Sequence, residues 1–216
     1  MPHGLTELAG YRVLFIMAAQ QEFGPHLQAR IDPLITGVGP IEAAIATTAA
    51  LGHCSNVGTP PDLVVSLGSA GSARLVHCGV YQASEVAWRD MDATALGFEA
   101  GVTPFLDLPA ALALPFRVTG IPTATLSTGA NIVSGAQYNA IAQDMVDMET
   151  FAVLRACMLA GVPLIALRGI SDGQSDLSGL HDWTEYLHII DEKLAAAVDS
   201  LQAGLENGAL EAHQRR

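Results

Sequence analysis

The segment 162–172, VPLIALRGISD, constrains the fold more than any other part of the chain. It begins with a short apolar run, 162–167, which is too short for a helix and is typical of a strand buried on both faces. The segment then turns polar, with Arg168, Ser171 and Asp172. Ligands of open α/β sheets bind at the carboxyl ends of the strands. Asp172 is therefore predicted to lie where an enzyme of this class keeps an acid.

Two more acids follow predicted strands. Glu149 comes directly after a short strand at 146–148, and Glu22 follows a continuous apolar strand at 11–19. A single acid at a strand end is often no more than a solvated surface group. Acids at the ends of three strands favour a site, and paired carboxylates suit the cleavage of a glycosidic bond. In that chemistry one carboxylate activates water and another protonates the leaving group.

A fourth strand, predicted at 62–67, runs into the small residues GSAGS at 68–72. Small residues there let backbone N–H groups approach a ligand closely. The segment is neither a Walker A motif nor a GxGxxG fingerprint. No histidines have HExxH spacing, so zinc-protease chemistry is not indicated. Arg168 either holds an acid or an anion or is a plain salt-bridge partner.

Strands and helices alternate without an internal repeat, which is the three-layer α/β pattern. Segment 89–114 has no clear period and is interpreted as a long functional loop. The remaining predicted strands are 33–36, 80–88, 116–118 and 123–127, and the predicted helices are 23–29, 41–51, 134–143, 150–161 and 184–202.

Length and charge narrow the functional classes. The chain has 216 residues and is expected to form a single domain, 1–216. Its net charge of −12 argues against nucleic acid and anionic membrane as partners. No apolar run reaches the roughly 18 residues of a membrane helix. Half of the residues are hydrophobic, which suggests an apolar surface that a second subunit covers.

The cysteines and the N-terminal residues indicate the cellular compartment in which the protein is expected. There are 3 cysteines, widely spaced and without a CxxC pair, so neither a disulfide framework nor a metal site is expected. The N-terminal apolar run has no basic start, and a signal peptide is not expected. A reducing cytoplasm fits these features.

Taken together, four segments resemble the nucleoside phosphorylase/nucleosidase superfamily, and specifically the methylthioadenosine/S-adenosylhomocysteine nucleosidases. They are AAQQEF (18–23), DLVVSLGSAGS (62–72), VDMET (146–150) and VPLIALRGISD (162–172). A fifth, RDMDATALGFEAG at 89–101, resembles the loop that reaches the dimer interface in this family. Order and spacing agree over nearly the whole chain.

The resemblance implies a fold, an assembly and a reaction. The fold is a three-layer α/β/α sandwich around a twisted mixed sheet, and the assembly is a homodimer. The reaction is hydrolysis of the N-glycosidic bond of an adenine nucleoside, as in methionine salvage, with no metal and no cofactor. Asp172 matches the acid that protonates the adenine, and Glu22 matches the carboxylate that orients and deprotonates water.

The same resemblance implies a set of substrate-binding residues. Glu149 matches the carboxylate that binds the ribose hydroxyls. The other matching residues are Met148 against the sugar, Ser69 and Arg168 near the water and the acids, Ser171 beside Asp172, and Ile132 and Val133 in the segment whose backbone binds the adenine edge.

The chain also departs from the family pattern. It is short between Glu22 and Gly37, Ile132 replaces the aromatic residue usually stacked on the purine, and Asp147 replaces a longer acid. Trp183 is a candidate for the wall of the 5′ pocket. These departures concern the substrate more than the reaction. Two alternatives remain: a phosphorylase in which phosphate replaces water, and a catalytically silent nucleoside-binding protein.

Overall fold

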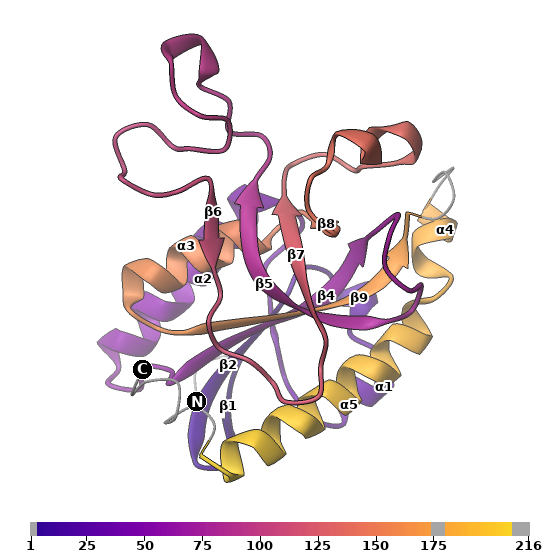
Figure 1. Ribbon diagram of the computed structural model, residues 1–216. Coiled ribbons are helices and arrows are strands. Elements are labelled where there is room, and N and C mark those ends of the chain that lie inside the picture. The colour runs from indigo at the N-terminus through magenta and orange to yellow at the C-terminus, as the bar shows by residue number, and fades with distance from the viewer. Residues whose placement is uncertain (1–3, 174–179, 209–216) are drawn as a thin grey trace.

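The computed structural model describes residues 4–173 and 180–208. Their strands form a single mixed sheet (Figure 1). The strands are β1 (Leu5–Leu8), β2 (Tyr11–Met17), β3 (Leu34–Ile35), β4 (Leu63–Gly71), β5 (Val80–Trp88), β6 (Ala111–Ala113), β7 (Thr123–Thr128), β8 (Met145–Asp147) and β9 (Leu164–Asp172). The α-helices are α1 (Pro25–Gln28), α2 (Pro40–Asn56), α3 (Thr150–Ala160), α4 (Leu180–Thr184) and α5 (Leu187–Glu206). Short 3₁₀ turns are η1 (Gln20–Glu22), η2 (Thr94–Leu96) and η3 (Gly135–Ala140).

The centre of the sheet is built on β4 and β9, which run parallel and pair along most of their length. β2 continues the sheet on the other side of β4, and β5 pairs antiparallel with β9. β7 lies parallel to both β5 and β8, and β8 also touches the end of β4 at Gly71. The pairings β4–β9–β5–β7–β8–β4 thus close a ring. The ring brings the carboxyl ends of β4, β8 and β9 together.

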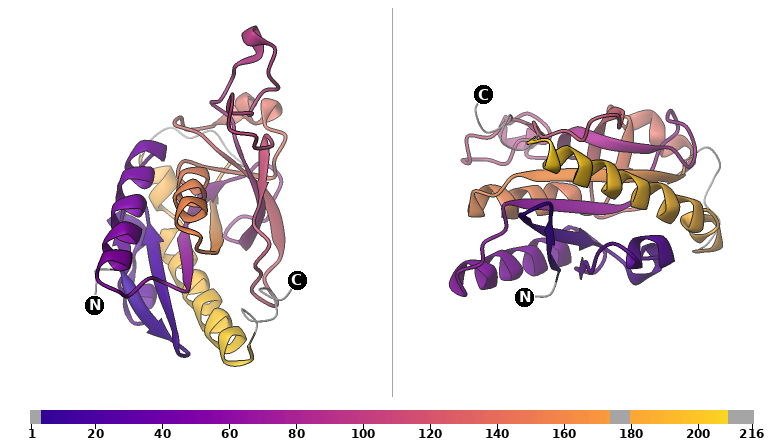
Figure 2. Two further views of the ribbon diagram at one scale, coloured as in Figure 1. Left: turned by 90° about the vertical axis from the view of Figure 1, so that its left-hand side faces the viewer. Right: turned by 90° about the horizontal axis from the view of Figure 1, so that it is seen from below.

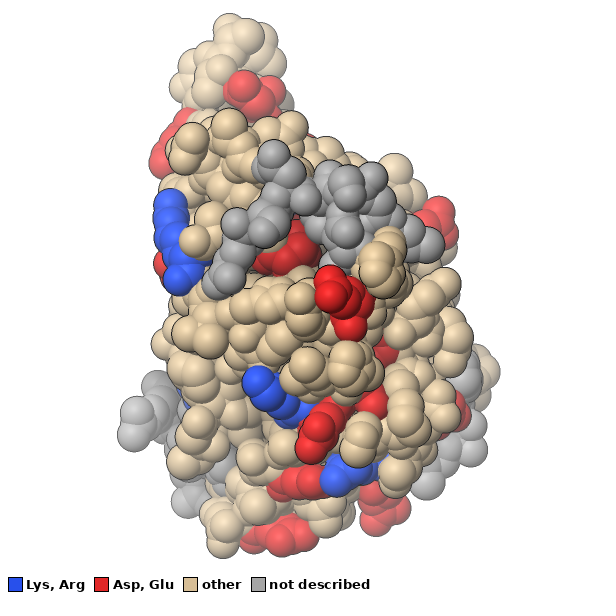
Figure 3. All heavy atoms as spheres, turned by 90° about the vertical axis from the view of Figure 1, so that its right-hand side faces the viewer, with Lys and Arg blue, Asp and Glu red and all other residues tan. Residues whose placement is uncertain are grey.

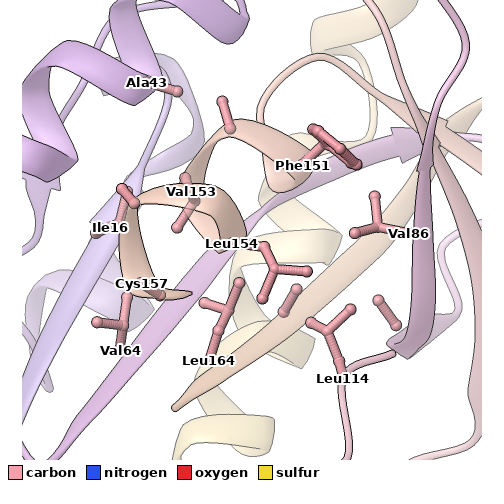
Figure 4. Packing of buried hydrophobic residues seen from close by; sticks show 14 of the residues in the cluster. Ile16, Ala43, Val64, Val86, Leu114, Phe151, Val153, Leu154, Cys157 and Leu164 are labelled. Atoms are coloured by element: carbon pink, nitrogen blue, oxygen red, sulfur yellow. The ribbon is translucent and has the colours of Figure 1, made fainter. Parts of the chain in front are cut away.

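Helices cover both faces of the sheet, which confirms the predicted three-layer α/β/α arrangement (Figure 2). On one face α2 and α3 pack on the strands, and Figure 4 shows Phe151, Leu154 and Cys157 of α3 against strand residues such as Val64. α2 is buried along one stripe at helical spacing, at Ala43, Thr47, Leu51 and Cys54.

The opposite face is covered by α5, with α1 beside it. α5 buries apolar residues at helical spacing from Leu187 to Leu205. Its Asp191 accepts hydrogen bonds from the backbone N–H groups of His26 (2.9 Å) and Leu27 (3.0 Å) at the start of α1. This anchors the segment that follows β2 and η1 to the helix layer.

Several predicted boundaries are wrong. β4 does not end at Leu67 but continues to Gly71, so the predicted glycine loop is strand. No strand forms at 116–118; a short strand, β6, precedes it instead. The predicted helix 134–143 is only the turn η3. The predicted long loop after β5 does project beyond the sheet in Figure 1, although η2 and β6 lie within it.

Candidate active site

Glu22 lies in η1, directly after β2, and its side chain is buried. Its Oε1 accepts hydrogen bonds from the backbone N–H (2.7 Å) and the hydroxyl (2.6 Å) of Ser69 in β4. Glycine at position 68 favours this approach, because a Cβ there would lie 3.3 Å from both carboxylate oxygens, which is a tight contact. Burial raises the pKa of Glu22, while the bonds from Ser69 and the charge of Arg168 lower it.

One pocket joins residues that are far apart in the sequence. Its polar lining includes Glu22, Ser69, Glu149 and Arg168, four of the predicted site residues. The rest of the lining is Ile16, Ala18, Thr36, Ser66, Leu67 and Gly68. The pocket therefore lies at the carboxyl ends of parallel strands, where the sequence predicted a ligand site.

Glu149 immediately precedes α3, at the N-cap position. Its Oε1 accepts a hydrogen bond of 2.7 Å from the backbone N–H of Gly39, the residue before α2. Burial raises the pKa of Glu149 to about 7, the nearby charge of Asp147 adds to the rise, and the Gly39 bond and Arg168 oppose it. A carboxylate in this position can change its protonation state near neutral pH.

Arg168 in β9 is a buried salt-bridge partner at the wall of the pocket. It lines the pocket, yet its guanidinium is buried and bonded to the carboxylate of Asp147 through Nη2 (3.0 Å) and Nε (3.1 Å). Nη2 also donates to the hydroxyls of Ser66 (2.9 Å) and Thr150 (2.6 Å). Its charge is thus largely balanced within the protein.

Asp172 is the last residue of β9. Ser171 donates its hydroxyl hydrogen to Asp172 Oδ1 (2.6 Å), and the hydroxyl of Tyr138 lies 3.4 Å from Oδ2. Burial raises the pKa of Asp172, while the bonds from Ser171 and Tyr138 and the charge of His77 lower it. Gly71 in β4 makes room for this group, since a Cβ there would lie 2.8 Å from Oδ2.

The other predicted binding residues lie at the margins of this arrangement. Met148 is half-buried between Asp147 and Glu149. Val133 is buried and packs with Tyr138 and Val146, whereas Ile132 is 67% exposed. None of these residues is among those lining the pocket around Glu22.

An arginine holds the segment that contains Ile132. Arg89 donates from Nη1 to the carbonyl oxygen of Ser127 (2.7 Å) and from Nη2 to that of Asn131 (2.6 Å). Asp90 accepts from the backbone N–H of Ala130 (2.5 Å). The start of the long segment after β5 thereby fixes the turn that follows β7.

Sequence reasoning did not assign Tyr138 or His77 to the site. Tyr138 contacts Asp172, and His77 Nε2 lies 2.9 Å from the carbonyl oxygen of Ser171. Neither belongs to a motif, and their positions depend on tertiary packing. Trp183 was only a candidate wall residue; its indole Nε1 donates to Ser69 Oγ at 2.9 Å.

The described residues offer little for a metal site or a membrane span. No group of three or more His, Cys, Asp or Glu within residues 4–173 and 180–208 could hold a metal ion. None of the described helices has the length and apolar character needed to cross a membrane. Figure 3 shows one face of the molecule, on which acidic side chains outnumber basic ones, in keeping with the net charge of −12.

Comparisons with known proteins point to one superfamily. Residues 123–203 match the phosphorylase superfamily. A 5′-methylthioadenosine/S-adenosylhomocysteine nucleosidase of Actinobacillus succinogenes is 29% identical over 193 residues, which cover 80% of each chain.

Solved structures share the fold. A protein of Francisella philomiragia, described as a 5′-methylthioadenosine/S-adenosylhomocysteine nucleosidase, superposes with a TM-score of 0.74 at 19% identity, covering 88% of this chain and 97% of that one. A futalosine hydrolase mutant of Helicobacter pylori gives a TM-score of 0.73 at 17% identity, covering 86% and 96%. The fold is therefore that of these hydrolases, and the resemblance of the chain to the nucleoside phosphorylase/nucleosidase superfamily, and within it to the methylthioadenosine/S-adenosylhomocysteine nucleosidases, is confirmed.

Proposed function

We propose that this protein hydrolyses the N-glycosidic bond of an adenine nucleoside, such as 5′-methylthioadenosine or S-adenosylhomocysteine, and releases adenine. The observation that carries the proposal is the pairing of Glu22 and Glu149 in one pocket, with Asp172 at the end of the strand that supplies Arg168. The name of the Actinobacillus succinogenes relative supports the same reaction.

Asp172 is the proposed general acid. Adenine leaves readily only after its ring accepts a proton, so the acid must hold a proton near neutral pH. The raised pKa of Asp172, caused by burial, favours that state. Ser171 would orient the carboxyl group through its 2.6 Å hydrogen bond.

Glu22 is the proposed base for the attacking water. Ser69 holds one carboxylate oxygen through two hydrogen bonds, which fixes the plane of the group. Carboxylates around the sugar would also lower the energy of an oxocarbenium-like transition state. The positive charge of Arg168 lowers the pKa of Glu22 and so favours the carboxylate that a base requires.

Glu149 is the proposed ligand of the ribose hydroxyls, because an ionised carboxylate can accept two O–H hydrogen bonds. Met148 would pack against the sugar, and the backbone near Ile132 and Val133 would bind the edge of the adenine. The buried position of Val133 and the Arg89 contacts give that backbone a defined course.

The same site disfavours a phosphorylase. Phosphate needs cationic or backbone donors. Arg168 is the cationic residue in the lining of the pocket, and its guanidinium is already bonded to Asp147. Glu22 would repel a bound phosphate. Water is therefore the better nucleophile for this pocket.

We also propose that the chain forms a single domain over 1–216 and acts as a homodimer. The proposed compartment is the cytoplasm, and the proposed pathway is methionine salvage. Exposed apolar side chains support a covered surface, among them Ile41 (70%) and Ile45 (61%), one turn apart on α2, and Phe105 (92%) in the segment after β5. Sedimentation equilibrium tests the assembly: twice the chain mass of 22.5 kDa is expected, and a mass of one chain would reject the homodimer.

Product analysis tests the reaction. The purified protein is incubated with 5′-methylthioadenosine with and without phosphate, and adenine and the sugar product are quantified. Equal adenine release in both buffers is the expected result. A requirement for phosphate, with a sugar 1-phosphate as product, would identify a phosphorylase. Binding without cleavage, across a panel of 5′-substituted nucleosides, would identify a silent nucleoside-binding protein.

A further inference from the structure

The two tryptophans of the chain use their indole N–H groups differently. Trp88 in β5 packs on Phe151, and its Nε1 is buried without a hydrogen-bond partner in the described part of the chain. Trp183 in α4 donates from Nε1 to Ser69 Oγ at 2.9 Å. That serine hydroxyl is also the donor to Glu22 Oε1. Trp183 therefore connects α4 with the proposed water base.

The direction of the hydrogen bonds in this chain is fixed by chemistry. An indole N–H can only donate, so Ser69 Oγ accepts from Trp183. The single hydroxyl hydrogen of Ser69 then points to Glu22 Oε1, at 2.6 Å. The backbone N–H of Ser69 ends on the same oxygen, at 2.7 Å. Both donors of Ser69 therefore bond the same carboxylate oxygen, Oε1.

We propose that Trp183 is a positioning residue for water activation: its indole N–H fixes the Ser69 hydroxyl on Glu22, and so sets the orientation of the base. The inference rests on the proposed hydrolytic function, and it adds a residue that acts through Ser69 rather than on the substrate. Because Trp183 lies in α4, the position of this helix would then determine whether Glu22 is oriented to act as the base.

The charged groups that face Glu22 lie on other elements. Arg168 of β9 favours the ionised form of Glu22, and the pKa of Glu149, before α3, is raised by the charge of Glu22. Neither is bonded to Trp183 in the described residues. Since the Ser69 hydroxyl bond lowers the pKa of Glu22, a less ordered hydroxyl raises it. A base works only when deprotonated, so the acidic limb of kcat/KM then moves to higher pH.

The hydrogen-bond chain can be tested without turnover. In ¹⁵N-labelled protein, Trp88→Phe leaves Trp183 as the source of the indole N–H signal. Adding Ser69→Ala removes the acceptor and is expected to move that proton signal upfield. In the Trp88→Phe protein the signal should also shift with pH, and Glu22→Gln should abolish this shift. A signal that is unchanged by Ser69→Ala would overturn the proposal.

Kinetics test the consequence for the reaction. Trp183→Phe keeps an aromatic ring but lacks the donor, and loss of one hydrogen bond is expected to lower kcat about three- to ten-fold with little change in KM. The acidic limb of kcat/KM should move to higher pH. Trp88→Phe is the matched control and should behave as wild type.

A double-mutant cycle separates the hydrogen bond from ring packing. If Trp183 acts through Ser69, Trp183→Phe causes no further loss in a Ser69→Ala background. An equal loss in both backgrounds would show that the ring, not the N–H, matters, and would overturn the proposal. If the wild-type protein releases no adenine, the proposed function fails; the indole signal still decides whether Trp183, Ser69 and Glu22 are linked.

Discussion

Arg168 and Asp147 form an ion pair at 3.0 Å in which the side chains are only 3% and 1% exposed. Asp147 also accepts a hydrogen bond from Thr128 Oγ1 (2.6 Å) and one from the backbone N–H of Thr150 (3.0 Å) at the start of α3. The pair therefore joins β7, β8, β9 and α3 directly beneath the pocket. Asp147 thereby holds the helix start that presents Glu149.

Asp147→Asn is expected to destabilise the fold strongly. It leaves the buried guanidinium of Arg168 without the carboxylate to which it is bonded, and breaking a buried pair by removing one partner costs about 3–5 kcal/mol. Urea unfolding measures the loss. Asp199→Asn is the matched control, because the Arg30–Asp199 pair is 33% and 55% exposed and should contribute at most about 1 kcal/mol. Similar losses for both variants would contradict the assigned importance of the buried pair.

Asp172→Asn is expected to abolish turnover while largely preserving binding. The amide keeps the shape and can still accept the bond from Ser171, but it has no proton to give to adenine. Loss of a general acid lowers the rate by about 10²-fold or more. Adenine release and calorimetric binding of 5′-methylthioadenosine are measured on the same sample. Near-normal turnover would defeat the general-acid assignment.

Glu149→Gln is expected to weaken ribose recognition and to remove a pH dependence. The pKa of Glu149 is raised to about 7 by burial, so the carboxyl is partly protonated at neutral pH. Only the carboxylate accepts from two hydroxyls, so the affinity of the wild type should rise as pH increases from about 6 to 8. The variant should lose this rise, because an amide does not titrate.

Substrate comparison completes the test of Glu149. A 2′-deoxy nucleoside lacks one of the hydroxyls, so it should lose less affinity than the ribonucleoside when Glu149 becomes Gln. Glutamine can still accept from the backbone N–H of Gly39, which keeps the local fold. Equal losses for the two substrates would show that Glu149 does not bind the ribose.

The layers and the acids were predictable because each depends on a local pattern. Leu164 to Leu167 of the apolar run are buried strand, as predicted, although β9 begins two residues later than the run and continues to Asp172. β2 is parallel to β4, whereas β8 is antiparallel to it, so Glu22 and Glu149 meet through the closed ring of strand pairings and not at the shared edge of parallel strands. The end of β4 was misread because glycine is disfavoured in strands, whereas here Gly68 pairs with Arg168 and Ser69 with Gly169.

Other features depend on contacts that no local pattern records. Ser134 and Gln137 form the capping box of a helix start, yet η3 ends at Ala140. The guanidinium of Arg74 binds the carbonyl oxygens of residues 141, 142 and 143, so the chain after η3 is held by a contact from a segment distant in sequence. The contacts of Tyr138 and Trp183 with the site likewise join segments distant in sequence.

Tyr138→Phe is expected to move the alkaline limb of kcat/KM to higher pH. The tyrosine hydroxyl lies 3.4 Å from Asp172 Oδ2 and favours the carboxylate, which lowers the pKa of Asp172. Without it that pKa rises, and a general acid stays protonated, and active, to higher pH. The bond is long, so a small shift is expected. Tyr11→Phe, at the start of β2 and away from the pocket lining, is the control. An alkaline limb that stays in place or moves to lower pH in Tyr138→Phe would show that Tyr138 does not tune the acid.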